Sequence, residues 1–196
     1  MWLTLLLVAS GTGQLWQQRD PRLWARLPAP VAGRIQLLAD SAVRVRLPAE
    51  PLIQKALEGQ SKGAPGDRII TAVAALFRAL ENARSALGPG AVESEITAGA
   101  EWLRAGGTAP HLAGLRAAAP NRQLAVAIAM GTDLMTRGWT ENDAAAATDR
   151  FLTAKATDHD FLILRDRIEQ AVRAGGSPKA AVLSEVRRLE AGGNRP

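Results

Sequence analysis

The amino-acid sequence predicts an all-α fold, an irregular bundle or short array of about eight antiparallel helices joined by glycine-containing turns. Apolar residues recur at three- and four-residue steps from about residue 31 onward, which is the spacing of one helix face. Runs of strict apolar–polar alternation, which would indicate strands, are absent, and alanine, the strongest helix former, is abundant. The 196 residues are enough for one ordinary domain, which we expect over residues 34–190.

The amino-terminal region is expected to lie outside this domain. Residues 1–16 resemble a signal peptide, because a short apolar run from Trp2 to Ala9 is followed by small residues. The run is too short to cross a membrane, and the basic residues that normally precede such a run are missing. Three prolines among polar side chains predict an extended linker over 17–33. Residues 191–196 are expected to form a disordered tail.

The clearest helix covers residues 69–87, where Ile69, Val73, Leu76 and Leu80 share one face and the charged side chains lie mainly elsewhere. A single apolar stripe of this kind packs against a core. Similar stripes predict further helices at residues 35–45, 52–57, 92–103, 124–135, 144–152, 161–172 and 182–189, with a short helix around His111.

Glycines separate these stripes, each with a basic residue one or two positions earlier. The pattern occurs at Gly63, Gly106, Gly138 and Gly175 and is typical of a helix end, where glycine adopts the left-handed conformation easily. Helix-start signals follow: Ser177 before Pro178, Thr140 before Asp143 and Thr157 before Asp160. The short loops predict antiparallel neighbours. The unequal glycine intervals favour an irregular arrangement, although a repeat solenoid stays open.

The composition excludes several kinds of chemistry. Without cysteine the chain has no disulfide, thiolate metal site or cysteine nucleophile. The net charge is +5, but basic residues cluster only at residues 44–46 and 187–188, so we expect a mixed, solvated surface. His111 reads as an exposed histidine without a partner. The acids beside His159 diverge on a helix, and Glu93 and Glu95 point to different faces. We therefore expect no metal, no cofactor and no catalytic residues.

One segment of the sequence is similar to a segment of other proteins. Residues 47–69, LPAEPLIQKALEGQSKGAPGDRI, resemble a segment of uncharacterised exported bacterial proteins rich in alanine and arginine. The resemblance covers about an eighth of the chain and implies a secreted or periplasmic helical protein with no assigned activity. Within it, Lys55, Glu58, Lys62 and Arg68 are expected to be exposed, and they are the candidate interaction surface.

Three functions are compatible with the sequence. The first is a non-catalytic exported helical protein that binds an unknown protein or envelope component. The second is a cytoplasmic basic module that binds nucleic acid through Arg44, Arg46, Arg187 and Arg188, with residues 2–9 as part of the core. The third is an enzyme whose site assembles from distant residues such as His111, Glu101 and His159. The oligomeric state is not determined by the sequence.

Overall fold

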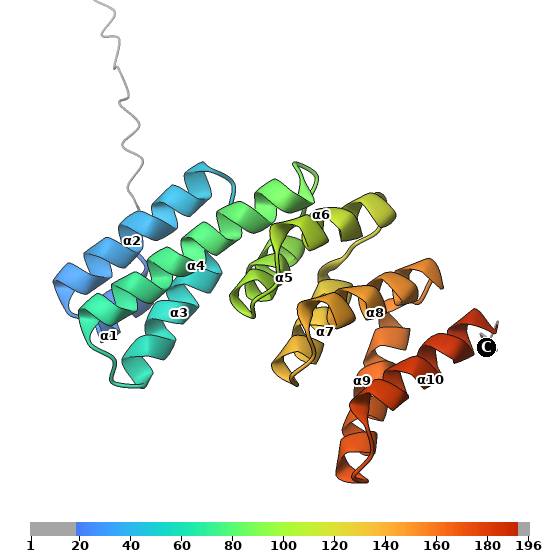
Figure 1. The fold of residues 1–196 in the computed structure, drawn as a ribbon. Helices are drawn as coiled ribbons and strands as arrows, with labels where there is room; N and C mark the ends of the chain where they lie inside the picture. The colour runs from blue at the N-terminus through green and yellow to red at the C-terminus, as the bar shows by residue number, and fades with distance from the viewer. Residues whose placement is uncertain (1–18, 192–196) are drawn as a thin grey trace, which may run out of the picture.

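The computed structural model describes residues 19–191, and in this part of the chain the regular secondary structure is all α-helix, without strands (Figure 1). The all-α prediction is confirmed, with ten helices in these residues in place of about eight. The helices are α1 (Pro21–Arg26), α2 (Ala29–Arg44), α3 (Glu50–Ser61), α4 (Gly66–Leu87), α5 (Glu93–Arg104), α6 (Ala109–Ala118), α7 (Ala125–Thr136), α8 (Glu141–Thr153), α9 (Asp158–Arg173) and α10 (Pro178–Glu190). The predicted leader and all of the predicted tail except Ala191 lie outside the described residues.

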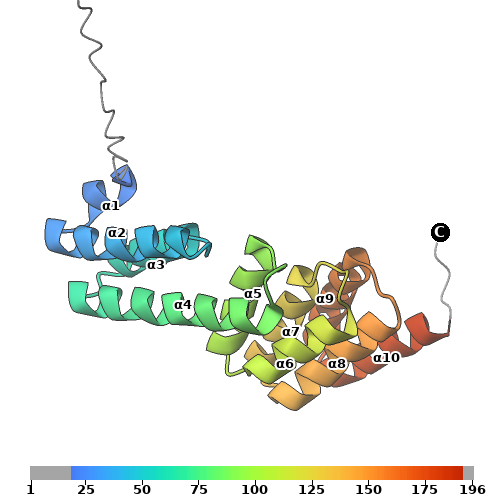
Figure 2. The ribbon, with the colours of Figure 1, turned by 90° about the horizontal axis from the view of Figure 1, so that it is seen from above.

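The helices form a short array of two layers. One layer contains α4, α6, α8 and α10, and the other contains α5, α7 and α9, with each helix packed against the next in its layer. The layers are joined mainly by α4 against α5, α7 against α8 and α9 against α10. Viewed from above, α6, α8 and α10 form one row and α5, α7 and α9 the row behind it (Figure 2). The array begins with α1, α2 and α3, which pack on one another and on α4.

The predicted linker over 17–33 is wrong for the residues that the structure describes. Asp20 caps α1, because its side chain accepts a hydrogen bond from the backbone N–H of Arg22 at 2.9 Å. The prolines stand at helix starts, where a missing N–H costs nothing: Pro21 begins α1, and Pro28 and Pro30 flank the first residue of α2. These helices bury apolar residues, so the domain starts well before residue 34.

The predicted glycines at helix ends and the predicted threonine caps at helix starts are confirmed. The four glycines singled out above have φ values between 68° and 101°, the left-handed region that side chains disfavour. At the helix starts, Thr157 and Asp160 form a reciprocal capping box, and the hydroxyl of Thr140 accepts from the N–H of Asp143 at 3.2 Å. These caps end one helix and begin the next within a few residues, which makes the layered arrangement possible.

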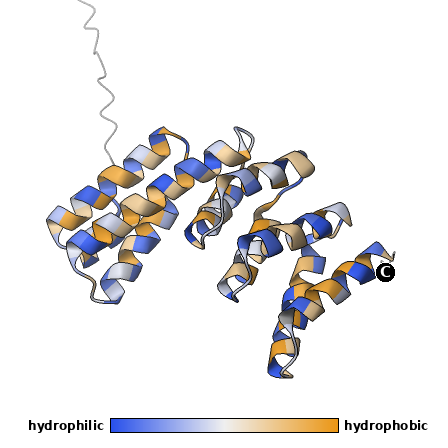
Figure 3. Ribbon diagram, in the orientation of Figure 1, coloured by the Kyte–Doolittle hydropathy of each residue, from blue (hydrophilic) through white to orange (hydrophobic). Residues whose placement is uncertain are grey.

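A contiguous apolar core runs through the array from Leu23 on α1 to Val186 on α10. Every helix carries both apolar and polar residues (Figure 3), as expected for helices that each keep a solvent-facing side. Some predicted stripe residues lie outside the core: Val45 follows the last residue of α2, and Val172 lies near the end of α9, and each is about half exposed. Among the described residues, we find no helix whose length and apolar character would allow it to cross a membrane.

Candidate functional site

The role of Lys55, Glu58, Lys62 and Arg68 as an interaction surface stays a prediction, and Lys55, which was expected to be exposed, has only 24% of its side chain exposed. On α3, Nζ of Lys55 lies 2.8 Å from a carboxylate oxygen of Glu58, and Lys62 pairs with the other oxygen of the same carboxylate. The two ammonium groups, first that of Lys55 and then that of Lys62, lower the pKa of Glu58 to about 2. Arg68 is exposed on α4 and takes no part in this cluster. The three charges on α3 therefore largely satisfy one another.

The structure does not bring His111, Glu101 and His159 together as one site. Glu101 pairs with Arg104 on α5 at 2.8 Å, and His159 is exposed at the start of α9. Nδ1 of His111 lies 2.6 Å from Oε1 of Glu141, the first residue of α8. Within residues 19–191, no cluster of three or more histidine, aspartate or glutamate side chains is placed to hold a metal ion.

His111 is half-buried and has a partner, so the expectation of an exposed histidine without one is wrong. The same Glu141 oxygen accepts a hydrogen bond from the N–H of Thr108 at 2.5 Å. Burial opposes ionisation of Glu141, but the hydrogen bonds from His111 and Thr108 outweigh it and lower the pKa of the carboxyl. This contact fastens the start of α6 to the start of α8 across one layer.

Trp102 lies where α5, α6, α7 and α8 meet. Its side chain is fully buried, Nε1 donates to the carbonyl of Thr108 at 3.2 Å, and the ring of His111 meets it edge-on at 6.4 Å between centroids. Gly107 and Gly131 make room for it, since a Cβ at either position would lie within 2.6 Å of the indole. A core role for Trp102, rather than stacking on a ligand, follows from this packing.

Glu95, unlike the exposed Glu93, is buried and holds a junction of three helices. Its carboxylate accepts from the guanidinium of Arg116 at 2.6 Å and from the backbone N–H groups of Leu124 at 2.8 Å and Val92 at 3.0 Å. Burial opposes its ionisation, but these hydrogen bonds outweigh the burial and lower the pKa of Glu95. Because each oxygen is satisfied by groups of this chain, Glu95 is a structural residue.

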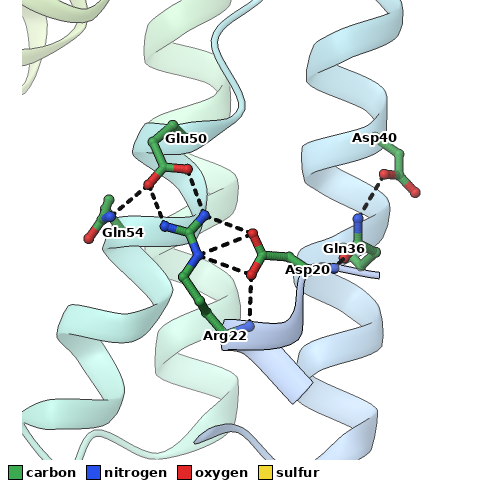
Figure 4. Close-up of polar contacts among 6 residues, drawn as sticks. All are labelled: Asp20, Arg22, Gln36, Asp40, Glu50 and Gln54. Carbon is green, nitrogen blue, oxygen red and sulfur yellow. Dashed lines mark hydrogen bonds and ion pairs between the residues drawn. The ribbon is translucent and has the colours of Figure 1, made fainter. Parts of the chain in front are cut away.

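The most connected polar cluster at the start of the array joins α1 to α3 (Figure 4). The guanidinium of Arg22 lies between two carboxylates, 2.7 Å from Asp20 and 2.7 Å from Glu50. Hydrogen bonds from Arg22 lower the pKa values of both Asp20 and Glu50, and the two carboxylates in turn raise the pKa of Arg22. The charges of Asp20, Arg22 and Glu50 are paired with one another, so these three side chains stabilise the packing of α1 on α3.

A groove between α7 and α9 differs from these clusters, because apolar side chains are left open to solvent there. The cavity is about 160 Å³, and Leu162 at its edge is 55% exposed. The lining residues are Val126, Ala129, Met130 and Asp133 from α7 and Phe161, Leu162, Arg165 and Ile168 from α9. An engineered cavity of about 150 Å³ in another protein holds one benzene molecule, so this groove has room for one large apolar side chain.

Charged residues border one end of the groove. Glu169 on α9 is surrounded by three guanidiniums, at 3.4 Å from Arg165, 3.2 Å from Arg173 and 3.9 Å from Arg137, the residue that follows α7. Arg137 also pairs with Asp133 at 2.8 Å. Three guanidiniums thus share two carboxylates at this end of the groove.

Two other hollows lie on the opposite layer. One, between α4 and α6, is lined mainly by small residues such as Ala86, Ala109 and Ala113. The other, between α8 and α10, includes Trp139 and Leu183. We regard the α7–α9 groove as the candidate functional site, because Leu162 at its edge is 55% exposed, more than Leu183 in the α8–α10 hollow at 38%.

The comparisons with known proteins add no further constraint. No family model, curated protein or solved structure matches the chain. The functional assignment therefore depends on the geometry described above. Sequence reasoning missed the α7–α9 groove; the signal was present in Leu162, an apolar residue that lies off the buried stripe of its helix.

Proposed function

We propose that this chain is a non-catalytic exported protein that binds another protein through the surface of its helical array. The observation that carries the proposal is the α7–α9 groove, where Leu162 is exposed beside a cluster of arginine and acidic side chains. Exposed apolar side chains rimmed by polar groups are typical of protein interaction sites. The polar clusters described above support a binding role rather than catalysis, because their charged groups are occupied in holding helices together.

Export is a separate part of the proposal. It is supported by the signal-peptide-like pattern of residues 1–16 and by the resemblance of residues 47–69 to exported bacterial proteins. N-terminal sequencing of the mature protein tests it directly. A new amino terminus after residues 9–16 is expected, whereas an intact Met1 on protein recovered from the cytoplasm would contradict export.

The experiment for binding uses a photo-reactive amino acid placed at Ala129 in the groove and, as a matched control, at Ala117 on α6, because both alanines are exposed on helices. A partner crosslinked in living cells from residue 129, but not from residue 117, is then purified and titrated against the unmodified chain. Saturable binding supports the proposal. If no partner binds the purified chain, the proposed function is wrong.

Nucleic acid serves as the comparison ligand in the same titration. The four arginines expected to contact phosphate are carried by the segment that ends α2 and by α10, which lie at the two ends of the array (Figure 1). Arg188 is also neutralised by Glu185 at 2.6 Å and Asp160 at 3.3 Å. This separation does not favour one continuous phosphate-binding face, and we expect no steep decrease of DNA affinity with salt.

A further inference from the structure

We propose that the α7–α9 groove binds an amphipathic α-helix of a partner protein, which inserts one large apolar side chain and places an acidic residue against Arg165. This inference rests on the proposed binding function and specifies its ligand. It is drawn from the backbone available in the groove, the size of the apolar cavity and the charge at one end.

The ligand is a helix because the groove has no free backbone groups to offer. Both walls are α-helices whose interior N–H and C=O groups are already bonded within each helix. An extended peptide gains affinity by adding a strand to a sheet edge, and no sheet exists in the described residues. A helix satisfies its own backbone and needs only side-chain contacts, which the groove supplies.

The apolar part of the groove determines which side chain of the ligand can insert into it. Val126, Ala129 and Met130 stand at successive turns of α7 and face Phe161 and Leu162 across the groove. The lining extends over eight residues of each helix, from 126 to 133 and from 161 to 168, which is a length of about 10 Å. This length matches two turns of a bound helix, and the volume of about 160 Å³ accepts one leucine or phenylalanine side chain.

The charged end of the groove determines which charge the ligand should carry. Arg165 contacts Glu169 through Nε, and its side chain is 63% exposed, so the two terminal guanidinium nitrogens are accessible to a carboxylate of a ligand. These exposed nitrogens of Arg165 favour an acidic group over a basic one. α7 and α9 run parallel, since Arg122, just before α7, pairs with Asp158 at the start of α9, and Arg137, just after α7, pairs with Glu169 near the end of α9.

The test uses three fluorescently labelled synthetic helices of equal length and the full chain. The first carries a leucine anchor and a glutamate one to two turns away. In the second the glutamate is replaced by lysine, and in the third the leucine is replaced by serine. Binding is measured by fluorescence anisotropy at low salt. We expect saturable binding of the first helix, several-fold weaker binding of the second and at least about tenfold weaker binding of the third.

Variants of the protein locate the binding site. Ala129→Trp fills the groove from an exposed position, and Ala117→Trp makes the same change on the exposed face of α6. We expect A129W to weaken binding about tenfold or more and A117W to leave it within about twofold of the original value. Arg165→Glu reverses the preference, so that the lysine helix binds better than the glutamate helix. Circular dichroism confirms that each variant is folded.

The possible outcomes separate this inference from the proposed function. Absent binding of the first helix at about 1 mM, or equal binding to A129W and the unmodified chain, overturns the groove assignment. If A129W binds the crosslinked cellular partner as tightly as the unmodified chain does, the groove is wrong and the binding function stands. If neither a synthetic helix nor a cellular partner binds, both proposals fail.

Discussion

Replacing Gly131 by alanine should destabilise the protein, although alanine is the better helix former. Gly131 lies inside α7, and a Cβ at this position would be 2.6 Å from Cζ3 of Trp102 and 3.0 Å from the hydroxyl of Thr148. Carbon atoms in contact prefer about 3.5–4.0 Å, so the rigid indole would have to move by about 1 Å. Trp102 is fully buried and hydrogen-bonded to Thr108, so it cannot move without disturbing α6.

The two opposing effects have known sizes. Overpacking a well-packed core costs about 1–3 kcal/mol, and alanine in place of glycine in a helix interior returns about 1 kcal/mol. The 2.6 Å contact places the overpacking cost in the upper half of this range, about 2–3 kcal/mol, so we expect Gly131→Ala to lower the free energy of unfolding by about 1–2 kcal/mol. This corresponds to a decrease in Tm of about 2–8 °C for a chain of this size. The measurement is thermal and denaturant unfolding followed by the helical circular dichroism signal.

Gly114→Ala is the matched control. Gly114 is also inside a helix, α6, but it is exposed and nothing lies within 4 Å of where its Cβ would be. Here only the helix preference operates, so G114A should raise the free energy of unfolding by about 0.5–1 kcal/mol. If G131A proved as stable as the unmodified chain, the close packing of Trp102 on α7 would be refuted.

Two further predictions concern buried and exposed charge. Glu95→Ala removes the carboxylate partner of Arg116 and leaves two backbone N–H groups, those of Leu124 and Val92, without their acceptor. We expect it to lower the free energy of unfolding, measured by urea titration, by about 3–5 kcal/mol, and Glu95→Gln to lower it by less. The folded-state pKa values of Asp20 and Glu50 are lowered, so their stabilisation is complete above their unfolded values, about 4, and is lost as the pH falls through the folded values. The unmodified chain should therefore unfold at higher urea concentration than the Arg22→Ala variant at neutral pH, and this difference should disappear as the pH falls below 4; a difference that persists at low pH would contradict the assignment.

The prolines near the amino terminus show where local reasoning fails. Proline is common both in extended linkers and in the first turn of a helix, and the sequence alone did not separate the two. The capping side chain of Asp20 and the buried Leu23 favour the helix, and burial is decided by the position of α3 and α4. The same limit applies to His111, because its partner Glu141 belongs to another helix 30 residues away.

The sequence by itself determined the helical class and most helix boundaries. Apolar periodicity, glycine ends and threonine caps act within a few residues, so they can be read along the chain without knowledge of the fold. Only the tertiary structure decided which helices stack in each layer, which charges neutralise one another and where apolar surface is left open. The α7–α9 groove exists because two helices separated in sequence by α8 lie side by side, and no local pattern encodes that contact.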